Sequence, residues 1–269
     1  MDKSAQTEQL VAELSKGIIE PKITVVGCGG AGNNVVQRIF SDCRDRVETV
    51  AINTDERKLD EIEADKKILI GKDITQGEGA CGFPEVGEYC ADRARGVFKD
   101  VLAGSDIVII VAGMGGGTGT GAAPIVAEVS KELDAVTFAI AINPFSYETE
   151  RVRRASEGVK RLREITETTV VLDNDQLLKY AGDCSIGESF AIMERSIIKI
   201  IDSLCSQISE SFISQMTPEI EEMVHQIDEQ KNYELARVAS PETALIQASL
   251  EELQLKQPET QIENPLLIR

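Results

Sequence analysis

The feature that most constrains this chain is a run of glycines directly after its most apolar segment. Residues 107–112 read Ile-Val-Ile-Ile-Val-Ala, and the nine residues from Gly113 to Gly121 then include six glycines. A continuous apolar run of this length predicts a strand buried on both faces, as in the middle of a parallel sheet. Glycines leave backbone N–H groups accessible, and the helix predicted over 122–133 adds unpaired N–H donors at its start. The pattern predicts a site for the terminal phosphates of a nucleoside triphosphate. Its residues are Gly113, Gly115, Gly116, Gly117, Thr118, Gly119 and Thr120, with hydroxyl donors from the two threonines.

A second glycine-rich segment, residues 27–33, lies between a predicted strand over 22–26 and a predicted helix over 34–40. By itself it also fits the dinucleotide-binding turn of an oxidoreductase, which needs an acid about twenty residues further on. Asp55, after the strand predicted over 49–52, is close to that place, so this segment leaves NAD open. The first glycine run, and the lack of a recognisable hydride-transfer site, favour the triphosphate. The candidate binding residues here are Gly29, Gly30, Gly32, Asn33, Asn53 and Asp55.

Predicted strands and helices alternate along the chain, which predicts an α/β fold with a parallel sheet and helices on both faces. Ligands of such sheets bind at the carboxyl ends of the strands, where the glycine segments lie. A long helix is predicted over 189–212 from its apolar stripe, followed by a helical, acidic extension with no strand pattern. The predicted divisions are a lead-in (1–20), a nucleotide-binding domain (21–188), the long helix (189–213) and the extension and tail (214–269).

The formal net charge of −18 disfavours nucleic acid and anionic lipid as partners, because their phosphates are repelled. No segment has the length and apolarity to span a bilayer, and residues 1–20 lack a signal-peptide core. These features predict a cytoplasmic protein without direct membrane insertion. The six cysteines form no C-x-x-C pair and His225 is the only histidine, so we expect free thiols and no protein-built metal site.

Together these motifs resemble the tubulin/FtsZ family. The family signature Gly-Gly-Gly-Thr-Gly-Thr-Gly stands at 115–121, and the other segments resemble family loops in the same order along the chain. These are residues 27–33, 52–55, 77–87, 144–148 and 174–178, and the resemblance runs from about Ile23 to Leu204. It implies the Rossmann-like GTPase domain of that family, with GTP or GDP as ligand and Mg²⁺ held with the phosphates.

The resemblance also implies individual roles. Asn33 and Asn174 would contact the base, Phe190 would stack on it, and Glu194 stands where the family has Asp or Asn on the guanine edge. Gly79 and Ala80 belong to the segment that senses the γ-phosphate. Pro144 and Glu148 belong to the segment that contacts the ribose.

The sequence departs from the family pattern at two places. The family usually has a basic residue four positions after Glu148, but this chain has Val152, with Arg151, Arg153 and Arg154 around it. The family also completes its active site in trans with an Asn-x-Asp-x-x-Asp loop. That loop falls near residues 214–219, where Glu219 alone keeps a carboxylate and is the candidate catalytic residue.

We therefore expect GTP binding with slow or no self-stimulated hydrolysis. The protein would be a switch, a regulator or a non-standard assembly subunit linked to cell division or the cytoskeleton. The alternative is an active filament-forming GTPase that uses Glu219 or another acid. Expected partners are a second copy or a full-length FtsZ-type protein, and an adaptor at residues 261–269, which resemble the short FtsZ tail peptide.

Overall fold

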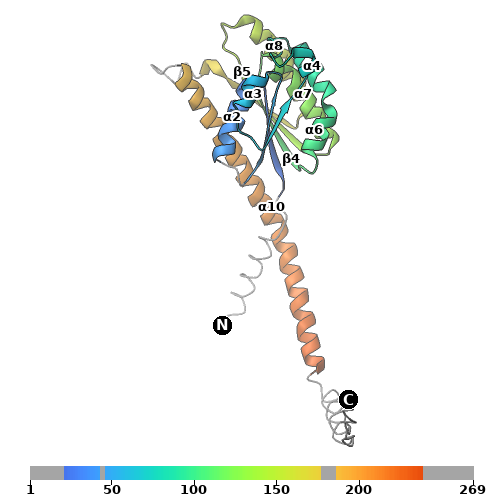
Figure 1. Ribbon diagram of the computed structural model, residues 1–269. Coiled ribbons are helices and arrows are strands. Elements are labelled where there is room, and N and C mark those ends of the chain that lie inside the picture. Colours follow the sequence, from blue (N-terminus) through green and yellow to red (C-terminus); the bar gives the residue numbers. More distant parts are fainter. Residues whose placement is uncertain (1–20, 43–45, 177–185, 239–269) are drawn as a thin grey trace, which may run out of the picture. The chain divides into compact units, whose positions relative to one another are not determined.

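The computed structural model describes residues 21–42, 46–176 and 186–238 (Figure 1). Its centre is a six-stranded sheet, parallel throughout, in the order β3-β2-β1-β4-β5-β6. The strands are β1 (Ile23–Cys28), β2 (Glu48–Asn53), β3 (Lys66–Leu69), β4 (Ile107–Gly113), β5 (Val136–Asn143) and β6 (Thr168–Asp173). The chain order reverses between β1 and β4, so a crevice is expected at the carboxyl ends of these two strands.

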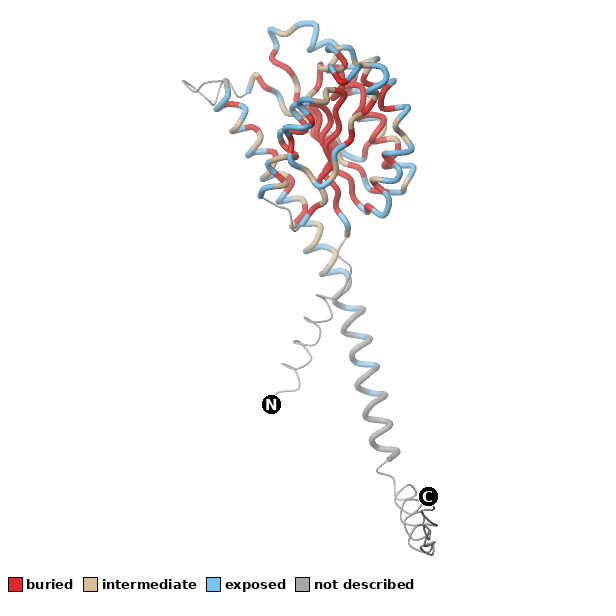
Figure 2. Tube along the Cα trace, viewed as in Figure 1, coloured by how far each residue is buried: buried red, intermediate tan, exposed pale blue. Residues whose placement is uncertain are grey.

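Helices cover both faces of this sheet, which confirms the predicted fold class (Figure 1). They are α2 (Gly29–Asp42), α3 (Glu56–Asp60), α4 (Lys72–Thr75), α5 (Pro84–Arg93), α6 (Arg95–Leu102), α7 (Gly117–Glu132), α8 (Thr149–Ile165) and α10 (Ile186–Val238). Alternate residues of β4 enter two different cores. Ile110 packs in the core with α5–α8, and Ile109 packs in the core with α2, α3 and α10. The buried residues concentrate in the strands between these layers (Figure 2).

The two glycine segments are largely helical, which corrects the predicted loops. Helix α2 begins at Gly29 instead of after Asn33, and α7 begins at Gly117 instead of at 122. The physical reason is close packing. A Cβ atom on Gly32 would lie 2.2 Å from the carbonyl oxygen of Val111, and one on Gly121 would lie 2.2 Å from the carbonyl oxygen of Pro84. Eight of the ten glycines in the two segments would bring a Cβ atom within 3.0 Å of a neighbouring atom, and only Gly30 and Gly116 have open space at that position.

Smaller differences concern the segment between β2 and β4. A single helix is expected over 84–103, but α5 and α6 are separated at Ala94, whose N–H bonds back to the carbonyl of Ala91 at 2.9 Å. Gly96 follows two residues after this break, inside α6. The short helices α3 and α4 were not predicted, although the Asp55 carboxylate accepts from the N–H of Lys58 at 3.1 Å as a normal amino-terminal cap.

The helix predicted over 189–212 is part of α10, which continues to Val238 with Pro218 inside it. Compact packing divides the chain at Phe212, so the sheet and the first half of α10 form one unit. The predicted boundaries at 188 and 213 both fall inside α10 and stay predictions. The predicted lead-in and tail lie outside the described residues. Within the described ranges, no helix is both long enough and apolar enough to cross a membrane.

Candidate functional site

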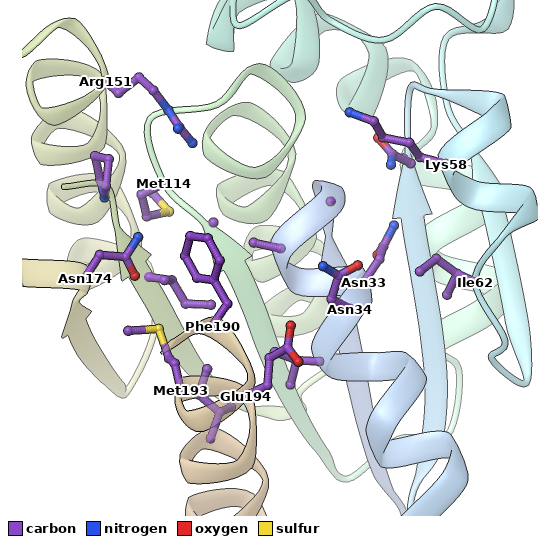
Figure 3. Close-up of a pocket in the computed structure, with 18 of the residues that line it drawn as sticks. Asn33, Asn34, Lys58, Ile62, Met114, Arg151, Asn174, Phe190, Met193 and Glu194 are labelled. Carbon is purple, nitrogen blue, oxygen red and sulfur yellow. The ribbon is translucent and has the colours of Figure 1, made fainter. Parts of the chain in front are cut away.

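A cavity of about 480 Å³ opens at the carboxyl ends of the strands, between α2 and α10 (Figure 3). A second cavity of about 340 Å³ continues from it toward the start of α7. The two share lining residues, namely Gly30, Ala31, Asn53, Lys58, Gly113 and Arg151. They therefore form one groove, with a size typical of small-molecule sites. We call the part next to α10 the amide end and the part next to α7 the glycine end.

The glycine end is formed by the first turns of α2 and α7. Gly29, Gly30 and the run from Gly116 to Gly119 line it. A Cβ atom on Gly30 would meet no heavy atom within 4 Å, and one on Gly116 would come no closer than 3.9 Å to its neighbours. These two glycines thus leave open space on the side of the groove. Two helix amino ends with accessible N–H groups make this end suited to an anion such as a phosphate.

Hydrogen bonds join the loops around the glycine end into one rim. The hydroxyls of Thr54 and Thr118 lie 2.7 Å apart, and the N–H of Gly79 donates to the carbonyl of Thr54 at 3.1 Å. The N–H of Gly115 donates to the hydroxyl oxygen of Thr120 at 2.7 Å. Thr118, predicted as a hydroxyl donor to phosphate, lines the glycine end, whereas Thr120 lines neither cavity and its hydroxyl bonds within its own segment.

Two cationic side chains flank the groove from opposite walls, Lys58 on α3 and Arg151 on α8 (Figure 3). The Lys58 ammonium lies 3.8 Å from a carboxylate oxygen of Asp55, which also lines the glycine end. The guanidinium of Arg151 lies 2.5 Å from the Glu148 carboxylate, whose other oxygen accepts from the N–H of Phe145 at 3.1 Å.

A basic side chain does line the groove next to position 152. Arg151 lines the groove, whereas Val152 does not line it and lies in a separate depression on α8. Arg154 donates to the carbonyl of Gly82 at 2.7 Å and so braces the rim. A shift of the basic side chain by one position thus stays a prediction.

Buried amides distinguish the amide end. Asn33, Asn53 and Asn174 are at most 7% exposed, and each has one polar atom without a hydrogen-bond partner. These atoms are Asn33 Oδ1, Asn53 Nδ2 and Asn174 Oδ1. The other amide atoms of Asn33 and Asn53 are used within the protein. Asn33 Nδ2 donates to the carbonyl of Ile52 at 3.2 Å, and Asn53 Oδ1 accepts from the N–H of Thr54 at 2.9 Å. An unpaired buried polar atom costs about 1–3 kcal/mol, so a ligand with both donors and acceptors could pair these atoms favourably.

An aromatic wall and a carboxylate complete the amide end. Phe190 on α10 is 39% exposed, projects into the cavity and lies 6.0 Å from the Phe145 ring (Figure 3). Glu194 follows one helical turn later and receives a hydrogen bond from Arg38 on α2. A flat apolar base could stack on Phe190 while its polar edge faces the amides and the carboxylate.

Most of the predicted binding residues thus meet in one groove, and a few do not line it. Gly32 is buried against β4, and Gly115, at φ 83°, packs on the backbone of Arg151. Glu219 lies on α10 outside the compact unit that holds the groove, and its side chain is not among those described. The sequence did not indicate that Lys58 lines the groove or that Arg38 contacts Glu194, because an isolated basic residue on a helix belongs to no motif.

Comparison with known proteins identifies the fold family. The model of the tubulin/FtsZ family, GTPase domain, matches residues 22–182. The chain belongs to the tubulin/FtsZ family. The resemblance drawn from the glycine motifs is thereby confirmed.

Archaeal FtsZ proteins are among the most similar members of the tubulin/FtsZ family. Cell division protein FtsZ 2 of Haloferax volcanii is 42% identical over 205 residues, which cover 76% of this chain and 51% of that protein. FtsZ 2 of Methanocaldococcus jannaschii is 43% identical over 190 residues, 71% of this chain and 50% of that protein. The chain therefore spans about half the length of the curated relatives it matches.

Solved structures of the tubulin/FtsZ family agree with this fold. An empty FtsZ dimer from M. jannaschii superposes with a TM-score of 0.71 at 40% identity, covering 78% of this chain and 60% of that chain. CetZ2 from Haloferax volcanii, described as a GTPγS-bound protofilament, gives a TM-score of 0.63 at 25% identity. The match covers 70% of this chain and 59% of the CetZ2 chain.

Proposed function

We propose that the groove binds a guanine nucleotide, with the base at the amide end and the phosphates at the glycine end. The observation that carries this proposal is the set of three buried amides, each with one unpaired polar atom, lining the same groove as two helix amino ends. The Asn174 oxygen and the Glu194 carboxylate can accept from the N1–H and amino group of guanine, and adenine lacks that pair of donors. The exposed ring of Phe190 offers a face for the base.

At the glycine end, the N–H groups of α2 and α7 would hold the phosphates, aided by Lys58 and Arg151. Mg²⁺ commonly binds to substrate phosphates together with one or two carboxylates and water. The Asp55 carboxylate lines this end and fits that role. In the described part of the chain, no group of three or more His, Cys, Asp or Glu side chains gathers to hold a metal ion. We infer that the phosphates supply most of the ligands, and the cation would neutralise part of their charge.

We propose further that this chain hydrolyses GTP slowly or not at all by self-association. Residues 214–219, where the family resemblance places a catalytic loop, are helical in α10, and Glu219 is the one carboxylate among them. A helix presents its side chains differently from a loop, so an acid is less readily directed at another subunit's nucleotide. This supports a GTP-dependent switch, a regulator or a non-standard assembly subunit.

The cellular role is proposed from relatives that are named as cell division proteins. Proposed partners are a second copy, a full-length FtsZ-type protein and an adaptor at the tail, whose residues lie outside those described. The second candidate function, a filament-forming GTPase, is favoured by CetZ2, the similar protein described as a protofilament.

The test has two parts. Nucleotide released from the purified protein is identified, and GTP turnover per subunit is then measured over a wide range of protein concentrations. We expect guanine nucleotide, with turnover near zero at every concentration. Release of a nicotinamide dinucleotide would refute the binding proposal. Turnover per subunit that rises steeply with concentration would favour the filament-forming GTPase instead.

A further inference from the structure

An ion pair links the base-binding wall to the opposite helix. Arg38 on α2 donates from Nε to Oε2 of Glu194 on α10, although the two residues are 156 positions apart in the sequence. Glu194 lines the cavity, and its side chain is only 16% exposed. The Arg38 side chain is 45% exposed and lines neither cavity. The arginine thus contacts the carboxylate without itself facing the ligand.

The ion pair restricts the conformational freedom of the Glu194 side chain before a ligand binds. A glutamate has three rotatable bonds and loses much conformational freedom when one rotamer is fixed. If this conformational entropy were lost on ligand binding, the affinity for the ligand and the selectivity between bases would both be lower. The Arg38 guanidinium fixes one carboxylate oxygen in advance, and the carboxylate is directed between the Phe190 ring and Asn34 (Figure 3).

We propose that Arg38 is a positioning residue for base selection. It holds the Glu194 carboxylate where this group accepts from the N1–H and the amino group of guanine. The inference rests on the proposed guanine-nucleotide function and adds the residue that sets its selectivity. Arg38 lines neither cavity, so we expect phosphate binding at the glycine end to be independent of it.

The chain contains a matched control. Arg46, just before β2, binds α10 through Asp202 at 2.5 Å and Ser206 at 3.0 Å. Each partner of this pair stands eight positions after its counterpart in the first pair, and Arg46 is 47% exposed, like Arg38. Asp202 does not line the cavity. Loss of Arg46 therefore removes a second ion pair to α10, with a more exposed carboxylate, without touching the base-binding wall.

The experiment measures dissociation constants of GDP, IDP and ADP for the full chain and for the Arg38→Ala, Arg38→Lys and Arg46→Ala variants. IDP lacks the amino group of guanine and reports on that one contact. A single charge-assisted hydrogen bond contributes about tenfold or more in affinity, so the unaltered chain should prefer GDP over IDP by about that factor. We expect Arg38→Ala to lower this preference to about threefold or less, Arg38→Lys to restore part of it, and Arg46→Ala to leave it unchanged.

The outcomes separate the two proposals. If Arg38→Ala keeps the full GDP preference, or if Arg46→Ala lowers it equally, Arg38 has no special role in positioning Glu194, and the inference is overturned. If the unaltered chain binds no guanine nucleotide, or binds GDP, IDP and ADP alike, the proposed function itself fails. Thermal unfolding of the two alanine variants separates selectivity from stability, and we expect the larger loss for Arg38→Ala because its partner carboxylate is less exposed.

Discussion

Replacement of Gly30 by alanine tests the glycine end most directly, because it should stabilise the ligand-free protein and weaken GTP binding. Gly30 is exposed in the first turn of α2, and its Cβ would meet no heavy atom within 4 Å. Its φ is not positive, so alanine adds no backbone strain. Alanine is favoured over glycine in a helix by about 0.5–1 kcal/mol. The substitution should therefore raise the melting temperature of the ligand-free protein by about 1–4 °C.

The same methyl group would stand in the groove where we place the phosphates. Loss of one or two charge-assisted hydrogen bonds from the helix amino end would cost about 1.5–3 kcal/mol, or roughly tenfold to a hundredfold in GTP affinity. Gly96→Ala is the control, because Gly96 is also exposed near the start of a helix with open space at its Cβ, but lies outside the groove. Calorimetric titration with GTP and thermal unfolding give both quantities. Unchanged GTP affinity in a stable Gly30→Ala protein would refute the assignment of the phosphate site.

Three further predictions concern other parts of the same unit. Gly32→Ala should destabilise the protein by about 3 kcal/mol in denaturant unfolding, because its Cβ would lie 2.2 Å from the Val111 carbonyl oxygen; a loss below roughly 1 kcal/mol would contradict this packing argument. Lys58→Ala should weaken GTP binding by about twofold to fivefold, and less at high salt, since its ammonium is exposed; a salt-independent loss in titrations would argue against a charge effect. Burial raises the pKa of Glu48, but the ammonium groups of Lys66 and Lys22 outweigh this effect and hold the pKa below its ordinary value of 4.5. The two lysines therefore stabilise the folded protein fully above a pH of about 4.5, and this stabilisation is lost as the pH falls through the lower folded-state pKa of Glu48. Glu48→Gln should flatten the acid side of a curve of unfolding free energy against pH. An unchanged curve would show that Glu48 does not contribute to the acid sensitivity.

Much of the fold follows from local sequence. The apolar run over 107–112 and the alternation of strands with helices predict a parallel sheet, since each strand must be buried by a crossover helix. Strand and helix limits differ from the predictions by a few residues at most places. The larger errors are the starts of α2 and α7 and the separation of α5 from α6. At α2 and α7, glycines permit a close approach that sequence cannot distinguish from a loop.

The candidate site, like the fold, was predicted only in part from the sequence. The sequence by itself determined which segments supply it, because glycines at strand ends and the residues around Asn53, Glu148 and Asn174 follow family motifs in order. Only the tertiary structure decided which side chains share a groove. Lys58 and Arg151 flank it from separate helices, and Arg38 reaches Glu194 across 156 positions. The physical reason is that motifs record local backbone requirements, whereas a contact between distant helices depends on how both pack against one sheet.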